Sequence, residues 1–459
     1  MTITEEIATW ITDSETILNG ESIRLARNAM IDIVGCMIAG GGDESTRRAG
    51  MVMTDFGTGS ARTIGCGRHL PAPHAALVNG TAAHALDFDD NYHPTAGHAT
   101  AVLAPAIFAL GDERSANGAS VLDAYATGLE AMAVIGNGVN LAHYELGWHT
   151  TSTIGGMGVA AAAARMCKFD KETTTHAISL AFSMASGSKI QFGTMAKPLH
   201  VGIAAMNGLL AARYAEAGIT ATAEPLDGKW GFRDLYVGGG GEGYAKNASN
   251  IRNPTALERY GLKVKIHPCC ASVHTAVDAL INLMAEHDLE VDDIKSVETI
   301  VNKVSFDNLM FDDPKTEMEA RFSMHYSIAV ALLRKRLVLA DFVSSAIKNS
   351  EVRALYPKIT MTKTSDDDPL PTATNGREPA ETRITLKGGE TLSKFLKHPK
   401  GTLQNPLSDA EMWAKFSDCL SSVADVKRAT AIRNMLESFE DINDIRDFTT
   451  LLTTVEAIL

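Results

Sequence analysis

The hydrophobic pattern of the sequence changes near residue 263, and this change constrains the fold more than any other feature. Before it, long segments rich in alanine and glycine place apolar residues at helical spacing. These segments cover residues 23–39, 99–110, 119–141, 155–166, 174–186 and 201–217. Alanine is the best helix former, and small residues allow helices to approach closely. The first part of the chain therefore predicts a set of tightly packed helices.

After residue 263 the pattern alternates between apolar and polar residues. Residues 296–304, 358–364 and 381–386 are predicted to be strands, and Lys387–Glu390 is predicted to be a hairpin turn into a further strand. Helical patterns at 272–287 and 325–333 lie among them, and amphipathic helix returns in the tail, 408–459. A chain of 459 residues also exceeds what one core usually organises, about 250–300 residues.

These patterns predict a mainly α fold with an α+β second domain. We expect a large all-helical domain from residues 1–264 and 401–459. A smaller α+β lid domain, residues 265–400, is expected to be inserted into it.

The composition limits the function. Hydrophobic residues make up 45% and charged residues 21%, a balance typical of a globular protein, and the net charge of −13 argues against nucleic-acid binding. We expect no membrane partner, because no apolar run reaches about 18 residues. The N-terminus lacks a signal-peptide pattern, and six cysteines in 459 residues do not suggest a disulfide framework. A cytoplasmic location is therefore predicted.

The densest polar cluster lies between residues 84 and 98. It contains three carboxylates and three imidazoles, namely His84, Asp87, Asp89, Asp90, His93 and His98. Carboxylate–imidazole pairs suit proton transfer near neutral pH, and Asp87 and Asn91 would share a helix face if the preceding helix continued. The alternatives are a solvated loop or a site for one divalent ion. A magnesium-diphosphate site is disfavoured because Asp89–His93 lacks the last carboxylate of Asp-Asp-x-x-Asp.

Two further motifs lie at predicted helix starts. His149 is followed by Thr150, Thr151 and Ser152, which could cap a helix whose N-terminus would attract an anion. Lys197 stands beside Pro198, which favours the first helical turn, and could bind a carboxylate or move a proton. The simpler alternatives are a helix cap with an exposed histidine and an ordinary surface lysine.

Two other motifs lie in the second domain. Cys270 and His274 are four residues apart, so the thiol and imidazole could meet on a helix. Arg321 could form a bidentate pair with a carboxylate, and Tyr326 could donate a proton. The alternatives are a buried packing cysteine and an amphipathic helix start.

Taken together and in order, five motifs resemble the MmgE/PrpD family, which includes 2-methylcitrate dehydratase, cis-aconitate decarboxylase and iminodisuccinate epimerase. The matching segments are 83–90, 147–164, 197–202, 319–326 and 405–408. The resemblance implies a homodimer, a site in the cleft between the helical and lid domains, and no metal or organic cofactor. The site residues that it implies are Asp87, Asn91, His98, His149, Lys197 and Tyr326.

The activities of this family share proton loss or carbanion formation beside a carboxylate. We therefore expect a hydro-lyase acting on a small di- or tricarboxylate. In this hypothesis Lys197 and Arg321 hold carboxylates, His98 or His149 is the base, and Tyr326 or the second histidine is the acid. Asp87 would orient a histidine.

The remaining substrate contacts are assigned to Asn91, Cys270 and His274. Cys270 replaces a histidine of the decarboxylase pattern, which favours a dehydratase or an epimerase. The alternatives are an epimerase, a decarboxylase and a non-catalytic scaffold.

Overall fold

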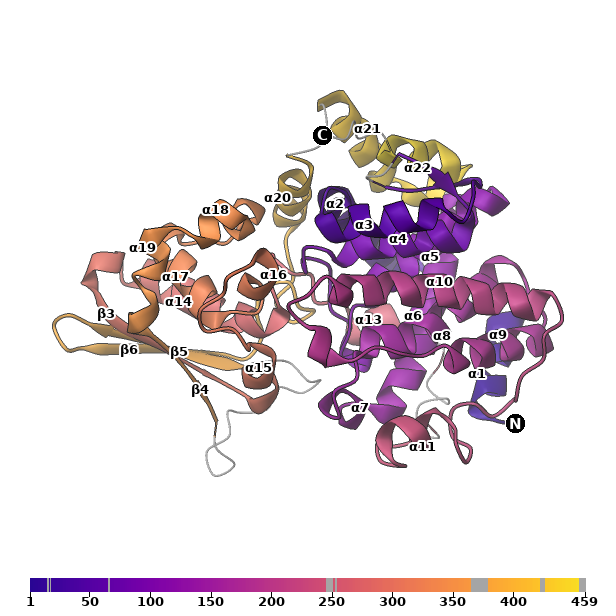
Figure 1. The fold of residues 1–459 in the computed structure, drawn as a ribbon, viewed down its shortest axis with the longest axis horizontal. Helices are drawn as coiled ribbons and strands as arrows, with labels where there is room; N and C mark the ends of the chain where they lie inside the picture. The colour runs from indigo at the N-terminus through magenta and orange to yellow at the C-terminus, as the bar shows by residue number, and fades with distance from the viewer. Residues whose placement is uncertain are drawn as a thin grey trace.

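A computed structural model describes residues 1–453 apart from 15, 17, 65–66, 245–250, 252–253, 365–378 and 422–425. Figure 1 shows a helical body and a smaller part that carries a sheet. The helical body contains α1 (Ile3–Asp13), α2 (Gly20–Gly41), α3 (Glu44–Thr54), α4 (Ala72–His84), α5 (Ala99–Arg114), α6 (Gly118–Val139), α7 (Ala142–Glu145), α8 (Thr150–Met166), α9 (Lys171–Ser183), α10 (Ala196–Glu216), α11 (Phe232–Val237) and α13 (Ala256–Tyr260). It also contains the C-terminal helices α20 (Asp409–Leu420), α21 (Val426–Glu437) and α22 (Ile445–Thr453), together with the short strands β1 (Ala61–Arg62) and β2 (His69–Leu70).

Small residues explain how the central helices pack. Helix α8 is buried on every side from Thr150 to Ala164, and α10 contacts both α8 and α4. Where α4 meets α10, a Cβ at Gly80 would lie 3.0 Å from Gly202 Cα, and a Cβ at Gly202 would lie 2.2 Å from Leu77 O. Only glycine permits this approach. The predicted helices of the first half are confirmed.

The sheet part contains one mixed four-stranded sheet in the order β4-β3-β5-β6. Its strands are β3 (Ile294–Val301), β4 (Ile359–Lys363), β5 (Ala380–Leu386) and β6 (Thr391–Leu396). Strand β3 pairs in parallel with β4 and antiparallel with β5, and β5 pairs antiparallel with β6. The predicted strands and the hairpin turn, which Leu386 N closes on Glu390 O at 2.8 Å, are confirmed.

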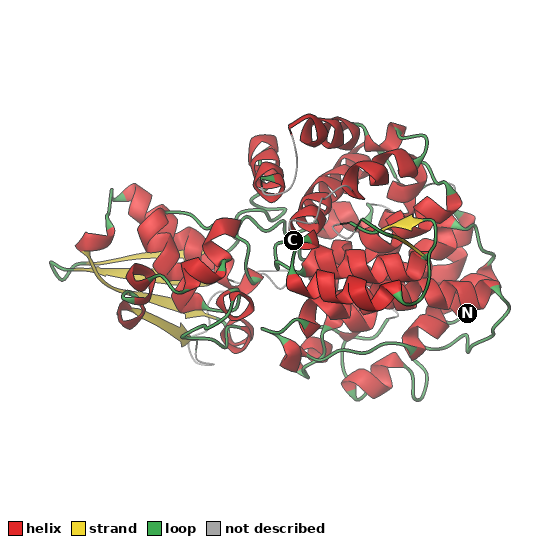
Figure 2. Cartoon of the chain, turned by 45° about the horizontal axis from the view of Figure 1, so that its top comes forward, coloured by secondary structure: helices red, strands yellow, loops and turns green. Residues whose placement is uncertain are grey.

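Helices cover one face of this sheet (Figure 2). The helices of the sheet part are α14 (Ala271–Glu286), α15 (Lys303–Asn308), α16 (Glu317–Ala320), α17 (Met324–Arg334), α18 (Ser344–Ile347) and α19 (Ser350–Arg353). Helix α14 contacts β5 and β6, and α17 contacts β4. Burial alternates along β5, as expected for a sheet with one covered face. The mainly α fold with a smaller α+β part is thus confirmed.

The described residues form two separate hydrophobic cores. One joins α1–α13 to residues of α20–α22, and the other joins α14 and α17 to the sheet. Residues far apart in sequence therefore complete the helical body, as Figure 1 shows for α20–α22 beside α2 and α5. The domain boundaries at 264/265 and 400/401 stay a prediction.

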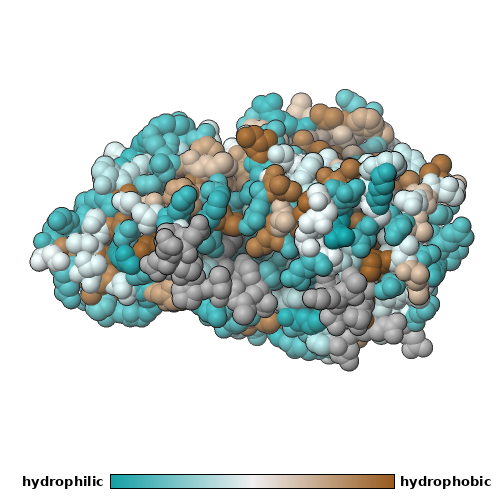
Figure 3. Space-filling model, turned by 90° about the horizontal axis from the view of Figure 1, so that it is seen from below, coloured by the Kyte–Doolittle hydropathy of each residue, from teal (hydrophilic) through white to brown (hydrophobic). Residues whose placement is uncertain are grey.

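The surface seen from below mixes hydrophilic and hydrophobic side chains (Figure 3). Within the described part of the chain, the helices are too short or too polar to traverse a lipid bilayer.

Candidate active site

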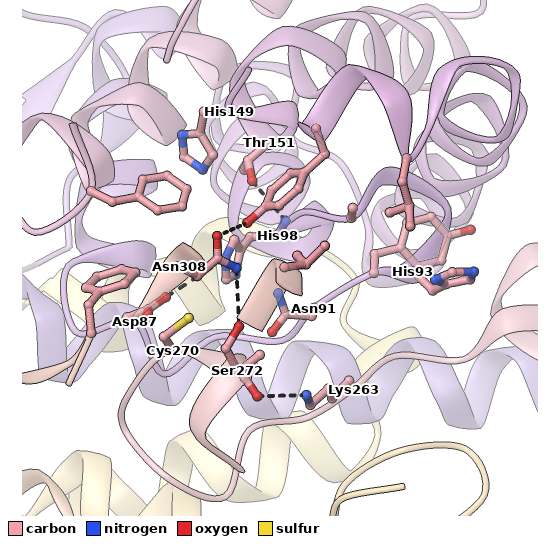
Figure 4. A pocket seen from close by; sticks show the side chains of 18 of the residues that line it. Asp87, Asn91, His93, His98, His149, Thr151, Lys263, Cys270, Ser272 and Asn308 are labelled. Atoms are coloured by element: carbon pink, nitrogen blue, oxygen red, sulfur yellow. Dashed lines mark hydrogen bonds and ion pairs between the residues drawn. The ribbon is translucent and has the colours of Figure 1, made fainter. Parts of the chain in front are cut away.

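A cavity of about 300 Å³ lies where the helical body meets the sheet part. Side chains from both parts line it (Figure 4). Six predicted site residues are among the lining residues: Asp87, Asn91, His98, His149, Lys197 and Cys270. The structure therefore brings together residues that are up to 183 positions apart in the chain.

Four long helices begin at this cavity. His98, His149 and Cys270 are the residues preceding α5, α8 and α14, and Lys197 lies in the first turn of α10. The side chains at these four caps make no capping hydrogen bond. The N-terminus of a helix carries a partial positive charge that favours anions. The cavity is therefore suited to a negatively charged ligand.

The prediction that Thr150, Thr151 or Ser152 caps α8 is wrong. His149 occupies the cap position, and the threonines lie inside the first turn. Thr151 instead accepts a hydrogen bond from the backbone N of His98 at 3.1 Å through its Oγ1. This bond ties the start of α5 to the start of α8.

Asp87 is held by two lysines. Its Oδ1 accepts from Lys197 Nζ at 3.0 Å and from Lys265 Nζ at 2.8 Å, and Lys265 also donates to Asp87 O at 2.7 Å. Burial alone would raise the pKa of the Asp87 carboxyl, but the two ammonium charges lower it below its usual value. Asp87 therefore stays a carboxylate. The helix predicted to continue to Asn91 ends at His84, and Asp87 adopts a left-handed backbone with φ of 49°.

Asp89 orients two histidines. Its Oδ1 lies 2.8 Å from His84 Nδ1, and its Oδ2 lies 3.0 Å from His98 Nδ1. Lys197 Nζ lies 2.7 Å from His84 Nε2, so this nitrogen accepts and the ring proton is on Nδ1. Burial lowers the pKa of His84 to about 3 and lowers that of His98. Both rings are therefore neutral at pH 7.

This arrangement changes the role expected for Asp87. We expected it to orient a histidine, but its Oδ1 lies 3.9 Å from His98 Nε2 and 4.0 Å from His84 Nε2. These distances are too long for a hydrogen bond. Asp87 instead fixes the lysines, and Asp89 fixes the imidazoles. Because His98 Nδ1 also lies 3.0 Å from Asp90 O, its Nε2 is left with a free lone pair.

His149 is the second imidazole at the cavity. It is buried, its Nδ1 lies 3.1 Å from His200 Nδ1, and its Nε2 has no hydrogen-bond partner among the described residues. Burial, assisted by the charge of Lys197, lowers the pKa of His149 well below its usual value. The ring is therefore neutral and can accept a proton from a ligand.

Three further polar side chains that line the cavity form a chain of hydrogen bonds. Tyr144 donates its hydroxyl to Asn308 Oδ1 at 3.1 Å, and Asn308 Nδ2 donates to Ser272 Oγ at 3.2 Å (Figure 4). This chain of bonds connects α7 of the helical body to α15 and α14 of the sheet part. Close by, the buried Asn91 Oδ1 has no hydrogen-bond partner among the described residues, and Lys263 Nζ donates to Ala271 O at 3.1 Å.

One group of side chains could geometrically hold a metal ion. Ligand atoms of His84, Asp87, Asp89 and His98 lie within 4.8 Å of one another. Lys197 and Lys265 already occupy Asp87 Oδ1, and Lys197 also occupies His84 Nε2. A divalent cation would have to displace two buried ammonium groups, so these residues do not fit a metal site.

The structure places three predicted site residues elsewhere. Tyr326 donates its hydroxyl to Asp341 O in the core of the sheet part. Arg321 donates its Nε to Leu86 O at 2.9 Å, which links the sheet part to the loop before Asp87. His274 donates its Nε2 to Cys269 O at 3.3 Å. Cys270 is the residue before α14, and His274 lies within that helix.

Several site residues were missed. Lys265 gives no local signal, because a lysine in the apolar stretch 262–266 is equally consistent with a strand edge. His84 and Asp89 belong to the cluster that drew attention to the site, but nothing in their spacing assigned them roles. His200 and Asn308 are brought to the cavity region only by the packing of α10 and α15.

Two family profiles match most of the sequence. The profile of the MmgE/PrpD N-terminal domain matches residues 5–243, and that of the MmgE/PrpD C-terminal domain matches residues 267–441. The chain belongs to the MmgE/PrpD family.

Similar proteins include human cis-aconitate decarboxylase, 29% identical over 393 residues, which cover 83% of this chain and 80% of the human protein. Cis-aconitate decarboxylase of Aspergillus terreus is 23% identical over 98% of this chain and 96% of its own length. The cis-aconitate decarboxylase-like protein oryM of Aspergillus oryzae is 24% identical over 98% of this chain and 97% of its own length. The resemblance inferred from the five motifs is thereby confirmed.

Proposed function

We propose that this protein is a lyase that acts on a small tricarboxylate by moving a proton at the carbon next to a carboxylate. The observation that carries this proposal is the pair of neutral imidazoles, His98 and His149, beside Lys197 in a cavity that attracts anions. A neutral imidazole is a competent base near pH 7, and a nearby ammonium stabilises the enolate-like charge that develops.

Dehydration is the first candidate reaction. One imidazole takes the proton from carbon, the electron pair of the broken C–H bond forms the C=C bond, and the hydroxyl group on the neighbouring carbon leaves as water after gaining a proton. Lys197 has three N–H bonds, of which Asp87 and His84 engage two. The third is available to a substrate carboxylate or to the departing hydroxyl.

Decarboxylation of cis-aconitate is the second candidate. It is favoured by the relatives, several of which are named cis-aconitate decarboxylase. The same residues would serve, because loss of CO₂ also leaves a carbanion that must be stabilised and then protonated. No additional cofactor is part of either proposal.

A product assay distinguishes the two. The protein is incubated separately with citrate, 2-methylcitrate and cis-aconitate, and products are followed by proton NMR and by release of CO₂. An unsaturated acid from a hydroxy acid supports the hydro-lyase, whereas CO₂ from cis-aconitate selects the decarboxylase. Carbon–hydrogen exchange without either product would favour an epimerase.

Two variants test the roles of the proposed residues in this assay. His149→Ala and Lys197→Gln are expected to lower kcat at least about 100-fold, as general acid–base groups do. A wild type that leaves every acid unchanged, or variants that retain full turnover, would contradict the proposal and favour a scaffold.

A further inference from the structure

Two imidazoles face each other at the cavity wall: His149 lines the cavity, and His200 lies beside it. His149 precedes α8, and His200 lies in α10 three residues after Lys197. Their Nδ1 atoms are 3.1 Å apart. Two imidazole nitrogens hydrogen-bond only when one carries a proton and the other a lone pair. The pair therefore shares a single proton at this position.

The position of His149 at the cavity indicates which ring carries that proton. His149 Nε2 is the ring atom left for a ligand, since it is buried and has no hydrogen-bond partner among the described residues. If this atom accepts a substrate proton, its lone pair must be free, and the proton of the resting ring is then on Nδ1. His149 Nδ1–H therefore donates to His200 Nδ1, and the proton of His200 is on its Nε2.

The partner of His149 differs from those of the other site histidines. His84 and His98 both face Asp89, which remains a carboxylate because burial raises its pKa less than the facing imidazoles lower it. His149 faces a ring that can accept a proton and release another. His200 is also only half-buried, whereas His149 is almost fully buried. His200 is thus the more exposed ring of the pair.

The charges around His149 disfavour an imidazolium that stays in place. Burial is the largest effect on its pKa, and the nearby Lys197, His84, His200 and His98 each lower that pKa further. His200 faces Lys197 as well. A proton taken up at His149 Nε2 would be less costly if the proton on Nδ1 could leave.

We propose that His200 relays the catalytic proton between His149 and solvent. This inference rests on the proposed function. An N–H bond forms at His149 Nε2 as the substrate C–H bond breaks, the His149 Nδ1 proton transfers to His200 Nδ1, and His200 Nε2 releases its proton to water. One proton leaves the substrate and one enters solvent. In the decarboxylase alternative the same chain runs in reverse and delivers a proton to the carbanion.

Two variants of His200 separate relaying from orientation. His200→Gln can still accept a hydrogen bond from His149 but cannot pass a proton on, and His200→Ala leaves a space. We expect both to lower kcat about 10- to 100-fold with KM within about two-fold of wild type. Added imidazole should restore His200→Ala and leave His200→Gln unchanged. His287→Gln, at the exposed end of α14, is the matched control and should equal wild type.

The outcome that overturns the relay is an active wild type whose His200→Gln variant keeps its kcat, because orientation alone would then suffice. Nitrogen-15 NMR of the resting protein provides a readout that needs no turnover. The relay predicts a proton on His149 Nδ1 and a bare Nε2, and the reverse tautomer would overturn it. An inactive wild type with the predicted tautomer would contradict the proposed function and leave the hydrogen-bonded pair established.

Discussion

Two lysines share one oxygen of Asp87, and this sharing determines both the charge and the shape of the site. Lys265 is fully buried and holds the side chain and the carbonyl of Asp87 together. It does not line the cavity, so it acts on the reaction through Asp87 and Lys197. The left-handed backbone of Asp87 is uncommon for a residue with a Cβ and needs such support.

Replacing this lysine tests its structural role. Lys265→Met should lower the free energy of unfolding by about 3 kcal/mol, since Asp87 would lose one of its two buried partners. Denaturant unfolding measures this change. The exposed Lys348→Met is the control and should remain within about 0.5 kcal/mol of wild type. A Lys265→Met protein as stable as the control would show that Lys197 alone suffices.

Asp90 gives a pH-dependent prediction. Burial, with the charges of Asp32 and Asp89, raises its pKa to about 8. Between about pH 4 and 8 the folded chain therefore holds a proton that the unfolded chain has released, so the contribution of Asp90 to stability falls as pH rises and is constant above 8. Asp90→Asn has no group that titrates at this position. The free energy of unfolding of Asp90→Asn minus that of wild type should therefore increase by up to about 1.4 kcal/mol for each pH unit across this window. Unfolding curves at several pH values measure the gap, and a gap that does not change with pH would contradict the assignment.

At the scale of elements, helix ends and one hydrogen-bond chain build the cavity. The starts of α5, α8, α10 and α14 surround the ligand space, and Tyr144, Asn308 and Ser272 connect the helical body to the sheet part. These contacts hold α15 over the cavity. The shape of the cavity is therefore partly preorganised before the substrate arrives.

Removing the middle of this chain should weaken substrate binding. Asn308→Ala loses both hydrogen bonds, each worth about 0.5–1.5 kcal/mol, so KM should rise about 5- to 150-fold with a smaller fall in kcat. Tyr144→Phe loses one bond but keeps the ring over which Lys189 Nζ lies at 3.8 Å, so its effect should be smaller. Steady-state kinetics measure both. An Asn308→Ala variant with wild-type KM would show that these bonds do not support binding.

The elements were more predictable from sequence than the partners within the site. Periodicity is local, so it predicted the first residue of α5 and placed the ends of β3 within two or three residues. Roles within the site depend on contacts between distant segments. Tyr326 stands at a helix start, but only the fold shows that its hydroxyl meets Asp341 O. Lys265 and Asp87 are 178 positions apart, and no local pattern joins them.

At the scale of the whole molecule, the cavity exists because the sheet part covers the starts of helices in the helical body. Both parts line the cavity, since Lys197 belongs to one and Cys270 to the other. The family resemblance further predicts a homodimer, and the cysteine usage and N-terminal pattern predict a cytoplasmic location. Light scattering of the purified protein measures the first directly.

Removal of metal ions should not change the activity of the whole molecule. Because ammonium groups contact Asp87 Oδ1 and His84 Nε2, in two of the four side chains that could bind an ion, dialysis against a chelator should leave kcat within about two-fold of the untreated enzyme. Addition of Zn²⁺ or Mg²⁺ should not increase it. Loss of activity on chelation and its recovery with one metal would contradict this view of the cluster.

Deuterium incorporation tests the central claim most directly. The protein is supplied with citrate or cis-aconitate in heavy water, and the carbon beside the carboxylate is examined by NMR. We predict deuterium at that carbon in the product or recovered substrate with wild type and His287→Gln, and at least about 100-fold less with His149→Ala. Turnover of cis-aconitate without deuterium at carbon would contradict the account, because both its hydration and its decarboxylation form a new C–H bond. Incorporation that persists after His149 is removed would also contradict it.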